Sequence, residues 1–222
     1  MNAIAAMALT FKLANTNQFI ELQQQTLKNT QALSNAFKEL GAKVPYGGSD
    51  SHMLLLDCKS YQSENGVPLN GDLGARILDL AGIVVNRNTI PGDKSALRST
   101  GIRMGTTWLT QRGFKENDFG TIAGLIDRLF KATRPYYMIG RTGNKTRAKL
   151  DFDTLNKINS DVRVMADSKP GIDEIDQLHG FPHYFYLEDH PRSGFGALEM
   201  TGETVRAFVN FTMTSDVEAL EP

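Results

Sequence analysis

The chain has 222 residues, of which 41% are hydrophobic and 22% charged, as in an ordinary globular protein. With 24 Lys and Arg against 25 Asp and Glu, its balanced charge gives no global argument for a nucleic acid or an anionic membrane as partner. The single cysteine, Cys58, excludes an intrachain disulfide, and no apolar run approaches the roughly 20 residues that span a bilayer. We therefore expect a cytoplasmic protein that binds neither membrane nor nucleic acid.

The first 41 residues favour two helices. Residues 2–14 are rich in Ala, Leu and Met and contain no Gly or Pro, which is typical of a short helix. Residues 19–40 carry apolar side chains at helical spacing, preceded by polar N-cap candidates and followed by Gly41. This pattern predicts a long amphipathic helix whose polar face is solvated.

Strands and helices alternate from residue 43 to residue 132. The pattern predicts strands at 43–46, 52–58, 83–86 and 99–106, and helices near 73–81 and 116–132. Such alternation favours an α/β fold, here an α+β sandwich of one sheet layer and one helix layer.

A second segment is expected after Thr133. From Arg134 on there are 10 basic and 14 acidic residues, a net charge of −4, whereas the 14 basic and 11 acidic residues before it give +3. We therefore place a domain boundary between 1–133 and 134–222. The weaker patterns of the second segment predict strands at 136–139, 184–187 and 197–200, a helical turn at 153–158 and a helix at 204–211.

Arg103 has a setting that suits a ligand with a carboxylate. Ile102 and Met104 alternate with it, so a strand would bury these two on one face and present the guanidinium on the other, between Gly101 and Gly105. The planar fork of a guanidinium matches a carboxylate in two hydrogen bonds. A structural arginine paired with a neighbouring acid is the alternative.

Five stretches carry a resemblance to a known family. They are NAIAAMALTFKLA at 2–14, FIELQQQTLKNTQALSNAFKELG at 19–41, GGSDSHMLLLD at 47–57, VNRNTIPGDKSALRSTGIRMGTTWLTQRG at 85–113, and RGFKENDF at 112–119. Together they resemble the C-terminal part of serine hydroxymethyltransferase, a pyridoxal-phosphate enzyme that interconverts serine and glycine with tetrahydrofolate as one-carbon carrier. The resemblance covers residues 1 to about 133.

The resemblance implies a fold and a set of roles. It implies the small C-terminal domain of a fold-type I pyridoxal-phosphate transferase, with a smaller mixed α/β extension. Arg103 would bind the amino-acid carboxylate, and Asn88 would contact the folate pterin, for which the alternative is a turn asparagine before Pro91. The family's cofactor lysine lies in a TTHK-like segment, and no lysine of this chain has such a setting. We therefore expect no catalytic residue here, and no tightly bound cofactor.

Other candidate sites are weaker. His52 opens an apolar strand and is interpreted as structural. His179, His183 and His190 do not predict a metal site, because Gly180 and Pro182 oppose a helix that would align the first two imidazoles. Residues 140–146 lack the glycine spacing of a phosphate-binding loop. The basic residues of 141–149 are expected in a solvated connecting loop, with binding of an anion or a folate polyglutamate tail as the alternative.

The leading hypothesis is thus a fragment of a glycine hydroxymethyltransferase that recognises serine or glycine and folate. The alternative is a non-catalytic folate-binding or assembly module of a fused one-carbon protein. The final residues, GALEMTGETVRAFVNFTMTSDVEALEP, loosely resemble the start of an aminomethyltransferase of the glycine cleavage system. Apolar surface left by a separated domain would favour a homodimer or domain-swapped pair through the N-terminal helices.

Overall fold

The structure is a computed structural model that describes residues 2–140 and 143–169. Its α-helices are α1 (Asn2–Ala14), α2 (Asn17–Glu39), α3 (Gly71–Leu80), α4 (Thr107–Gln111), α5 (Glu116–Lys131) and α6 (Phe152–Asp167). Its strands are β1 (Met53–Asp57), β2 (Asn86–Asn88), β3 (Gly101–Gly105), β4 (Thr133–Gly140) and β5 (Gly143–Leu150). Short 3-10 turns lie at Pro45–Gly47, Cys58–Ser60 and Ala96–Arg98.

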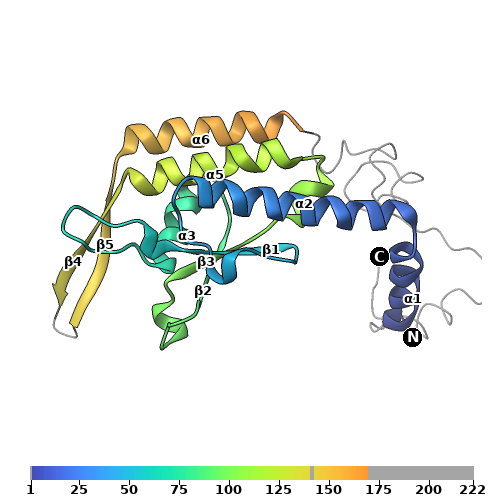
Figure 1. Ribbon diagram of the computed structural model, residues 1–222, viewed down its shortest axis with the longest axis horizontal. Helices are drawn as coiled ribbons and strands as arrows, with labels where there is room; N and C mark the ends of the chain where they lie inside the picture. Colours follow the sequence, from blue (N-terminus) through green and yellow to red (C-terminus); the bar gives the residue numbers. More distant parts are fainter. Residues whose placement is uncertain (1, 141–142, 170–222) are drawn as a thin grey trace, which may run out of the picture. The chain divides into compact units, whose positions relative to one another are not determined.

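The chain forms two compact units, and Gln23–Glu174 is the one that holds most of the described elements. Its centre is a three-stranded antiparallel sheet in the order β1-β3-β2. Helices of this unit cover one face of the sheet (Figure 1). α1 and the first residues of α2 belong to the other unit, and none of the residues of α1 is buried.

The core lies between the sheet and its helices. Leu54 and Leu56 of β1 and Ile102 of β3 are fully buried, with Phe37 of α2 and Phe130 of α5 packed into the same cluster. From Ile102 to Gly105, buried and exposed residues of β3 alternate, as in a strand that is covered on one face. Mixed α/β architecture is therefore confirmed.

Buried polar side chains join α2 to the segment after β3. The Asn29 amide donates to Thr110 Oγ1 at 2.8 Å and to the carbonyl oxygen of Phe114 at 2.9 Å. The hydroxyls of Thr30 and Thr106 lie 2.7 Å apart, and all four side chains are less than 9% exposed. Because buried polar groups are costly unless they are paired, these bonds fix how α2 packs on the rest of the unit.

Two of the expected strands differ from those observed. Between Lys43 and Tyr46 only Lys43 pairs with a strand residue, through a bridge to Asp57, and a 3-10 turn begins at Pro45. Pro45 has no N–H to donate to a sheet. β2 begins at Asn86 rather than at Ile83, because the Ile83 N–H bonds to the Leu78 carbonyl and completes the C-terminal cap of α3.

The segment after Thr133 begins with a hairpin and a helix. β4 contains the expected strand at 136–139, and α6 is longer than the expected turn at 153–158. The expected loop at 141–149 is wrong over residues 143–149, since β5 pairs with β4 over Gly143–Leu150. The basic and polar composition of this stretch suggested a loop, but the stretch forms a strand because β4 provides a partner for its backbone hydrogen bonds. The expected elements at 184–187, 197–200 and 204–211, and the three distal histidines, lie outside the described residues.

The hairpin and α6 pack onto the same core as the elements before them. Leu155 and Ile158 of α6 are buried in the cluster that contains Phe130, and Arg128 of α5 forms an ion pair with Asp161 at 3.0 Å. The boundary after residue 133 stays a prediction. None of the helices in the described ranges is both long and apolar enough to cross a bilayer.

Candidate substrate-binding face of the sheet

The three-stranded sheet has one covered face and one open face. On the covered face lie Leu54, Leu56, Ile102 and Met104, all buried. The register pairs Arg103 with Leu55 on one side and with Asn86 on the other. Directly paired residues point to the same face, so these three side chains form a row on the open face. No helix of the Gln23–Glu174 unit covers that row among the described residues (Figure 1).

Arg103 is exposed, and its guanidinium makes no hydrogen bond or ion pair within residues 2–140 and 143–169. The structure thus contains no acidic partner for Arg103 in the described part of the chain. A guanidinium offers five N–H donors in a fixed plane. The open face therefore presents a cation whose hydrogen-bonding capacity is available to an anionic ligand.

Asn88 ends β2 and lies one row further along the same face. It pairs with Gly101, two residues before Arg103 in β3, so the predicted carboxylate and pterin contacts share one surface. The Asn88 amide donates to the carbonyl oxygen of Thr89 at 2.7 Å. One N–H and the side-chain carbonyl oxygen remain for a further partner.

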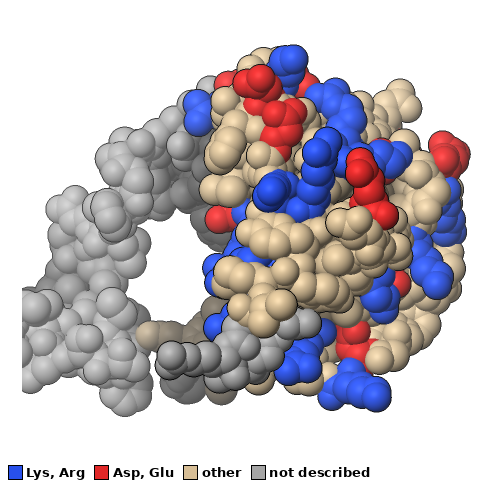
Figure 2. Space-filling view, turned by 90° about the vertical axis from the view of Figure 1, so that its left-hand side faces the viewer, with Lys and Arg blue, Asp and Glu red and all other residues tan. Residues whose placement is uncertain are grey.

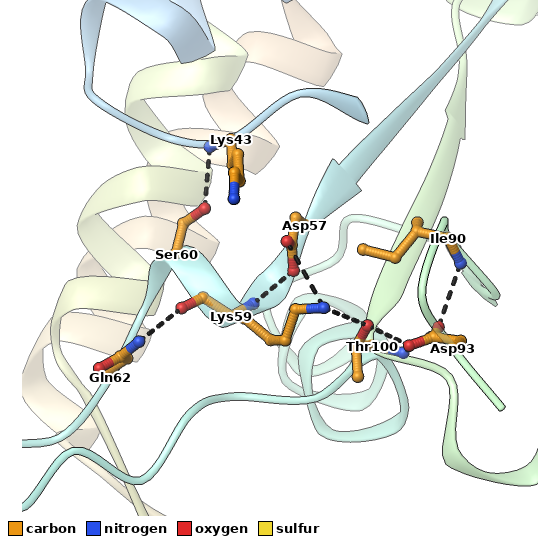
Figure 3. Close-up of polar contacts among 8 residues, drawn as sticks. All are labelled: Lys43, Asp57, Lys59, Ser60, Gln62, Ile90, Asp93 and Thr100. Atoms are coloured by element: carbon orange, nitrogen blue, oxygen red, sulfur yellow. Dashed lines mark hydrogen bonds and ion pairs between the residues drawn. The ribbon is translucent and has the colours of Figure 1, made fainter. Parts of the chain in front are cut away.

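A polar network holds the loop that connects β2 to β3 (Figure 3). The Asp93 carboxylate accepts the backbone N–H of Ile90 at 3.1 Å and that of Thr100 at 2.9 Å, and also the Thr100 hydroxyl at 2.6 Å. Lys59 donates to the same hydroxyl at 3.2 Å and lies 3.7 Å from Asp57. The network therefore ties the loop that follows Asn88 to the ends of β1 and β3.

The charge state of Asp93 follows from this network. Burial acts to raise the pKa of Asp93, but the hydrogen bonds from Thr100 and Ile90 and the nearby Lys59 ammonium outweigh it, so the pKa lies below its usual range. Sequence reasoning placed Asp93 in the loop without a role. The Pro-Gly-Asp order at 91–93 is a turn signal that could have indicated it.

The two glycines that flank Arg103 have different roles. A Cβ at Gly101 would overlap the Ile90 side chain and would lie 3.1 Å from the Asn88 carbonyl oxygen. A Cβ at Gly105 would meet only the His52 carbonyl oxygen, at 3.9 Å. Gly101 is therefore needed for the close approach of the Ile90 loop to β3, whereas Gly105 leaves open space beside Arg103.

Two other titratable side chains considered in the sequence, Cys58 and His52, form no hydrogen bond with Arg103 or Asn88. Cys58 is buried. Burial is the main cause that raises the pKa of its thiol far above the usual range, and the nearby Asp57 carboxylate raises it further. His52 is exposed, and its backbone carbonyl rather than its imidazole accepts hydrogen bonds, from Thr106. Within residues 2–140 and 143–169, His, Cys, Asp and Glu side chains form no group that could hold a metal ion.

A separate hollow lies between α2 and the loop at 46–50. It has a volume of about 450 Å³, and its lining includes Ser34, Lys38 and Asp50 but neither Arg103 nor Asn88. The candidate site is thus an open surface of the sheet rather than this hollow. The strand register places Arg103 on the face of the sheet opposite the core, and that face is open.

Fold and face together define an α/β domain whose open sheet surface carries a guanidinium free to pair with an anion. Comparison with known proteins shows which family the chain is related to. The family model of serine hydroxymethyltransferase matches residues 1–126. The chain is 43% identical over 132 residues to the cytosolic serine hydroxymethyltransferase of Oryctolagus cuniculus, covering 60% of this chain and 26% of that protein.

Two further relatives agree. The serine hydroxymethyltransferase of Bombyx mori is 42% identical over 130 residues, 59% of this chain and 27% of that protein. The probable cytosolic serine hydroxymethyltransferase of Schizosaccharomyces pombe is 37% identical over 181 residues, 78% of this chain and 38% of that protein. This chain belongs to the serine hydroxymethyltransferase family. It spans about a quarter of the length of the first two relatives.

The family depends on pyridoxal phosphate and tetrahydrofolate, as the resemblance implied. Curated relatives include both cytosolic and mitochondrial proteins, so the expected cytoplasmic location stays a prediction. The expected resemblance of the final 27 residues to an aminomethyltransferase falls outside the described residues and also stays a prediction.

Proposed function

We propose that this chain supplies the substrate-recognising surface of a glycine hydroxymethyltransferase, which converts serine and tetrahydrofolate to glycine and methylenetetrahydrofolate. Family membership supports the reaction class. The observation that carries the proposal is the unpaired Arg103 guanidinium on the open sheet face, with Asn88 one row away. In this proposal the chain acts as the small domain of a fold-type I enzyme.

Arg103 would bind the carboxylate of serine or glycine through two parallel N–H···O bonds. Such a fork fixes both the position and the plane of the carboxylate, and so sets the orientation of the rest of the amino acid. Pyridoxal phosphate, held elsewhere by the family's lysine, supplies the electron sink of the reaction. This chain contains no TTHK segment, so its own contribution is binding and orientation.

Asn88 would contact the pterin of the folate. Its amide already donates one N–H to the Thr89 carbonyl, which fixes the amide plane and leaves one donor and the oxygen acceptor for a pterin edge. Asp93 would act as a positioning residue, because it holds the backbone of the loop that follows Asn88. The two ligands would then meet on a surface that the register of β2 and β3 has already aligned.

A chimera tests the proposal. Residues 1–133 replace the matching segment of the Oryctolagus cuniculus enzyme, and serine cleavage is measured. We expect the chimera to be active, and Arg103→Ala to raise the KM for serine by about two orders of magnitude, since hydrogen bonds to charged groups contribute about 1.5–3 kcal/mol each. The KM of Arg103→Lys should lie between those of the unaltered chimera and the Arg103→Ala variant, because an ammonium carries the charge but lacks the planar fork.

Arg76→Ala is the matched control, because Arg76 is an exposed arginine of α3 whose partner is Asp72 on the same helix. It should leave the KM unchanged. An active chimera whose KM for serine is insensitive to Arg103→Ala would refute the role of Arg103. The isolated chain should neither cleave serine nor form the absorbance band of cofactor bound to lysine.

Titration of the isolated chain with tetrahydrofolate distinguishes the enzyme fragment from the alternative, a non-catalytic folate-binding module. A non-catalytic folate-binding module must bind folate without the rest of the enzyme, whereas a surface completed by another domain should bind it weakly. Micromolar affinity that is lost in Asn88→Ala would favour the binding module. Weak binding together with an active chimera would favour the enzyme fragment.

A further inference from the structure

The hairpin of β4 and β5 has one strongly basic face. Arg134 pairs with Lys149, Tyr136 with Arg147, and Met138 with Lys145. Directly paired residues point to the same side of a ribbon. One face, which we call the basic ribbon, therefore carries these six side chains, listed here in chain order: Arg134, Tyr136, Met138, Lys145, Arg147 and Lys149.

The four cations of the basic ribbon have no counter-charge. None of them makes a hydrogen bond or an ion pair within the described part of the chain, and none of the six side chains is acidic. Two other arginines of this unit, Arg76 and Arg87, both pair with Asp72. The hairpin differs in gathering four unpaired cations on one face.

The register also sets like charges against each other. Arg134 and Lys149 lie directly opposite on neighbouring strands, an arrangement that destabilises a hairpin. Figure 2 views the molecule from the side on which the hairpin projects in Figure 1, and on that face Lys and Arg side chains are interspersed with Asp and Glu. An anionic ligand on this face would relieve the repulsion.

Tyr136 gives the basic ribbon an aromatic surface among its cations. Its side chain is 39% exposed, and the Lys149 ammonium lies 5.9 Å from the centre of its ring. The opposite face of the hairpin anchors it to the unit, because Pro135 is buried there and Ala148 and Leu150 pack against the core. The basic face is therefore held outward by the packing of the other face.

We propose that the basic ribbon binds single-stranded nucleic acid. The cations of β5 recur at every second residue, about 6.8 Å apart along the strand, and would contact successive phosphates. Tyr136 would stack on an unpaired base, the combination by which proteins hold single strands. A stacked duplex offers no free base to that ring. The sequence already places three of these cations close together in 141–149, and the register adds Arg134 to the same face.

A membrane surface fits the hairpin less well. Ile139 is 88% exposed and is the most exposed apolar side chain of β4. It lies on the face opposite the basic ribbon, because its position alternates with Tyr136 and Met138. A bilayer that contacted the basic ribbon would receive Met138, which is 42% exposed, but not the more exposed Ile139.

Fluorescence anisotropy of the whole chain with a labelled 20-nucleotide oligouridylate tests the proposal, at several salt concentrations. Four phosphate contacts predict a slope of log K against log salt of about −3, since each contact on a single strand contributes about −0.7. Lys145→Ala with Arg147→Ala should reduce the slope to about −1.4. Tyr136→Ala should weaken binding about tenfold, and Tyr136→Phe should not.

The matched control removes two positive charges from α2 instead of from the hairpin. Lys28→Ala with Lys38→Ala takes two exposed lysines from α2 and should change the affinity less than twofold. Far-ultraviolet circular dichroism checks that each variant is folded. Equal affinity for the wild type and the Lys145/Arg147 variant would overturn the proposal. So would duplex binding as tight as single-strand binding, or preference for phosphatidylserine vesicles or polyglutamate over the oligonucleotide.

Discussion

The Thr100 hydroxyl donates a 2.6 Å hydrogen bond to Asp93, and the Thr100 backbone N–H donates to the same carboxylate at 2.9 Å. These bonds favour the charged form of Asp93, so its pKa in the folded chain lies below its usual range. A depressed folded pKa contributes stability above the unfolded value of about 3.9, and that stability is lost as pH falls through the folded pKa. Acid should therefore loosen the loop after Asn88.

Urea unfolding between pH 7 and pH 3 measures this effect. We expect Asp93→Asn to be less stable than the wild type at pH 7, and the difference to shrink as the pH falls below about 4. Asp50→Asn is the control, because Asp50 is exposed and its carboxylate has no partner in the described residues. A difference that stays constant over the whole range would show that the charge of Asp93 is unimportant.

Arg103 should matter for ligand binding and not for folding. Its guanidinium has no partner in the described part of the chain, so Arg103→Ala should change the free energy of unfolding by less than about 0.5 kcal/mol. Chemical denaturation of the isolated chain gives the value. A loss above about 1 kcal/mol would instead identify a structural arginine.

The two glycines beside Arg103 should respond differently to the same change. Gly101→Ala should destabilise the chain by about 1–3 kcal/mol, because the new methyl group overlaps Ile90. Gly105→Ala should change the free energy of unfolding by less than about 0.5 kcal/mol, as is usual for a surface change. Thermal unfolding of both variants is the measurement, and Gly101→Ala combined with Ile90→Ala should lose less than the sum of the two. Equal effects would contradict the packing role of Gly101.

Asn29 should be important for the packing of α2. Asn29→Ala leaves Thr110 and the Phe114 carbonyl without their donor, and an unsatisfied buried group costs about 1–3 kcal/mol. Urea unfolding should show this loss, while Lys28→Ala, one exposed position away, should fall within about 0.5 kcal/mol of the wild type. A neutral Asn29→Ala would mean that the polar network is dispensable.

α1 should mediate self-association. Ile4 and Phe11 are 67% and 66% exposed, and exposed apolar side chains on one helix favour contact with a second copy. Sedimentation of the wild type should show a homodimer or a domain-swapped pair, and Ile4→Ser with Phe11→Ser should shift it to monomer. Strictly monomeric wild type would contradict this prediction.

The sequence predicted those helices and strands whose signals lie within the element itself. Apolar spacing and stop residues predicted α2, α3 and α5, an apolar run predicted β1, and alternation predicted β3. It failed at Pro45, which begins a 3-10 turn, and at 143–149, where strand formation depends on pairing with β4. Polarity and lack of apolar residues describe a loop and an exposed ribbon equally well.

The sequence by itself determined which residue types flank Arg103, and with them the family to which the chain belongs. Only the tertiary structure decided that Arg103 and Asn88 share one open face, that Asp93 holds the loop between them, and that Arg134 joins the three cations of β5 on one side of a hairpin. The physical reason is register. Which side chains meet on a sheet is set by the backbone hydrogen bonds between strands, and these join residues whose separation along the chain carries no local signal.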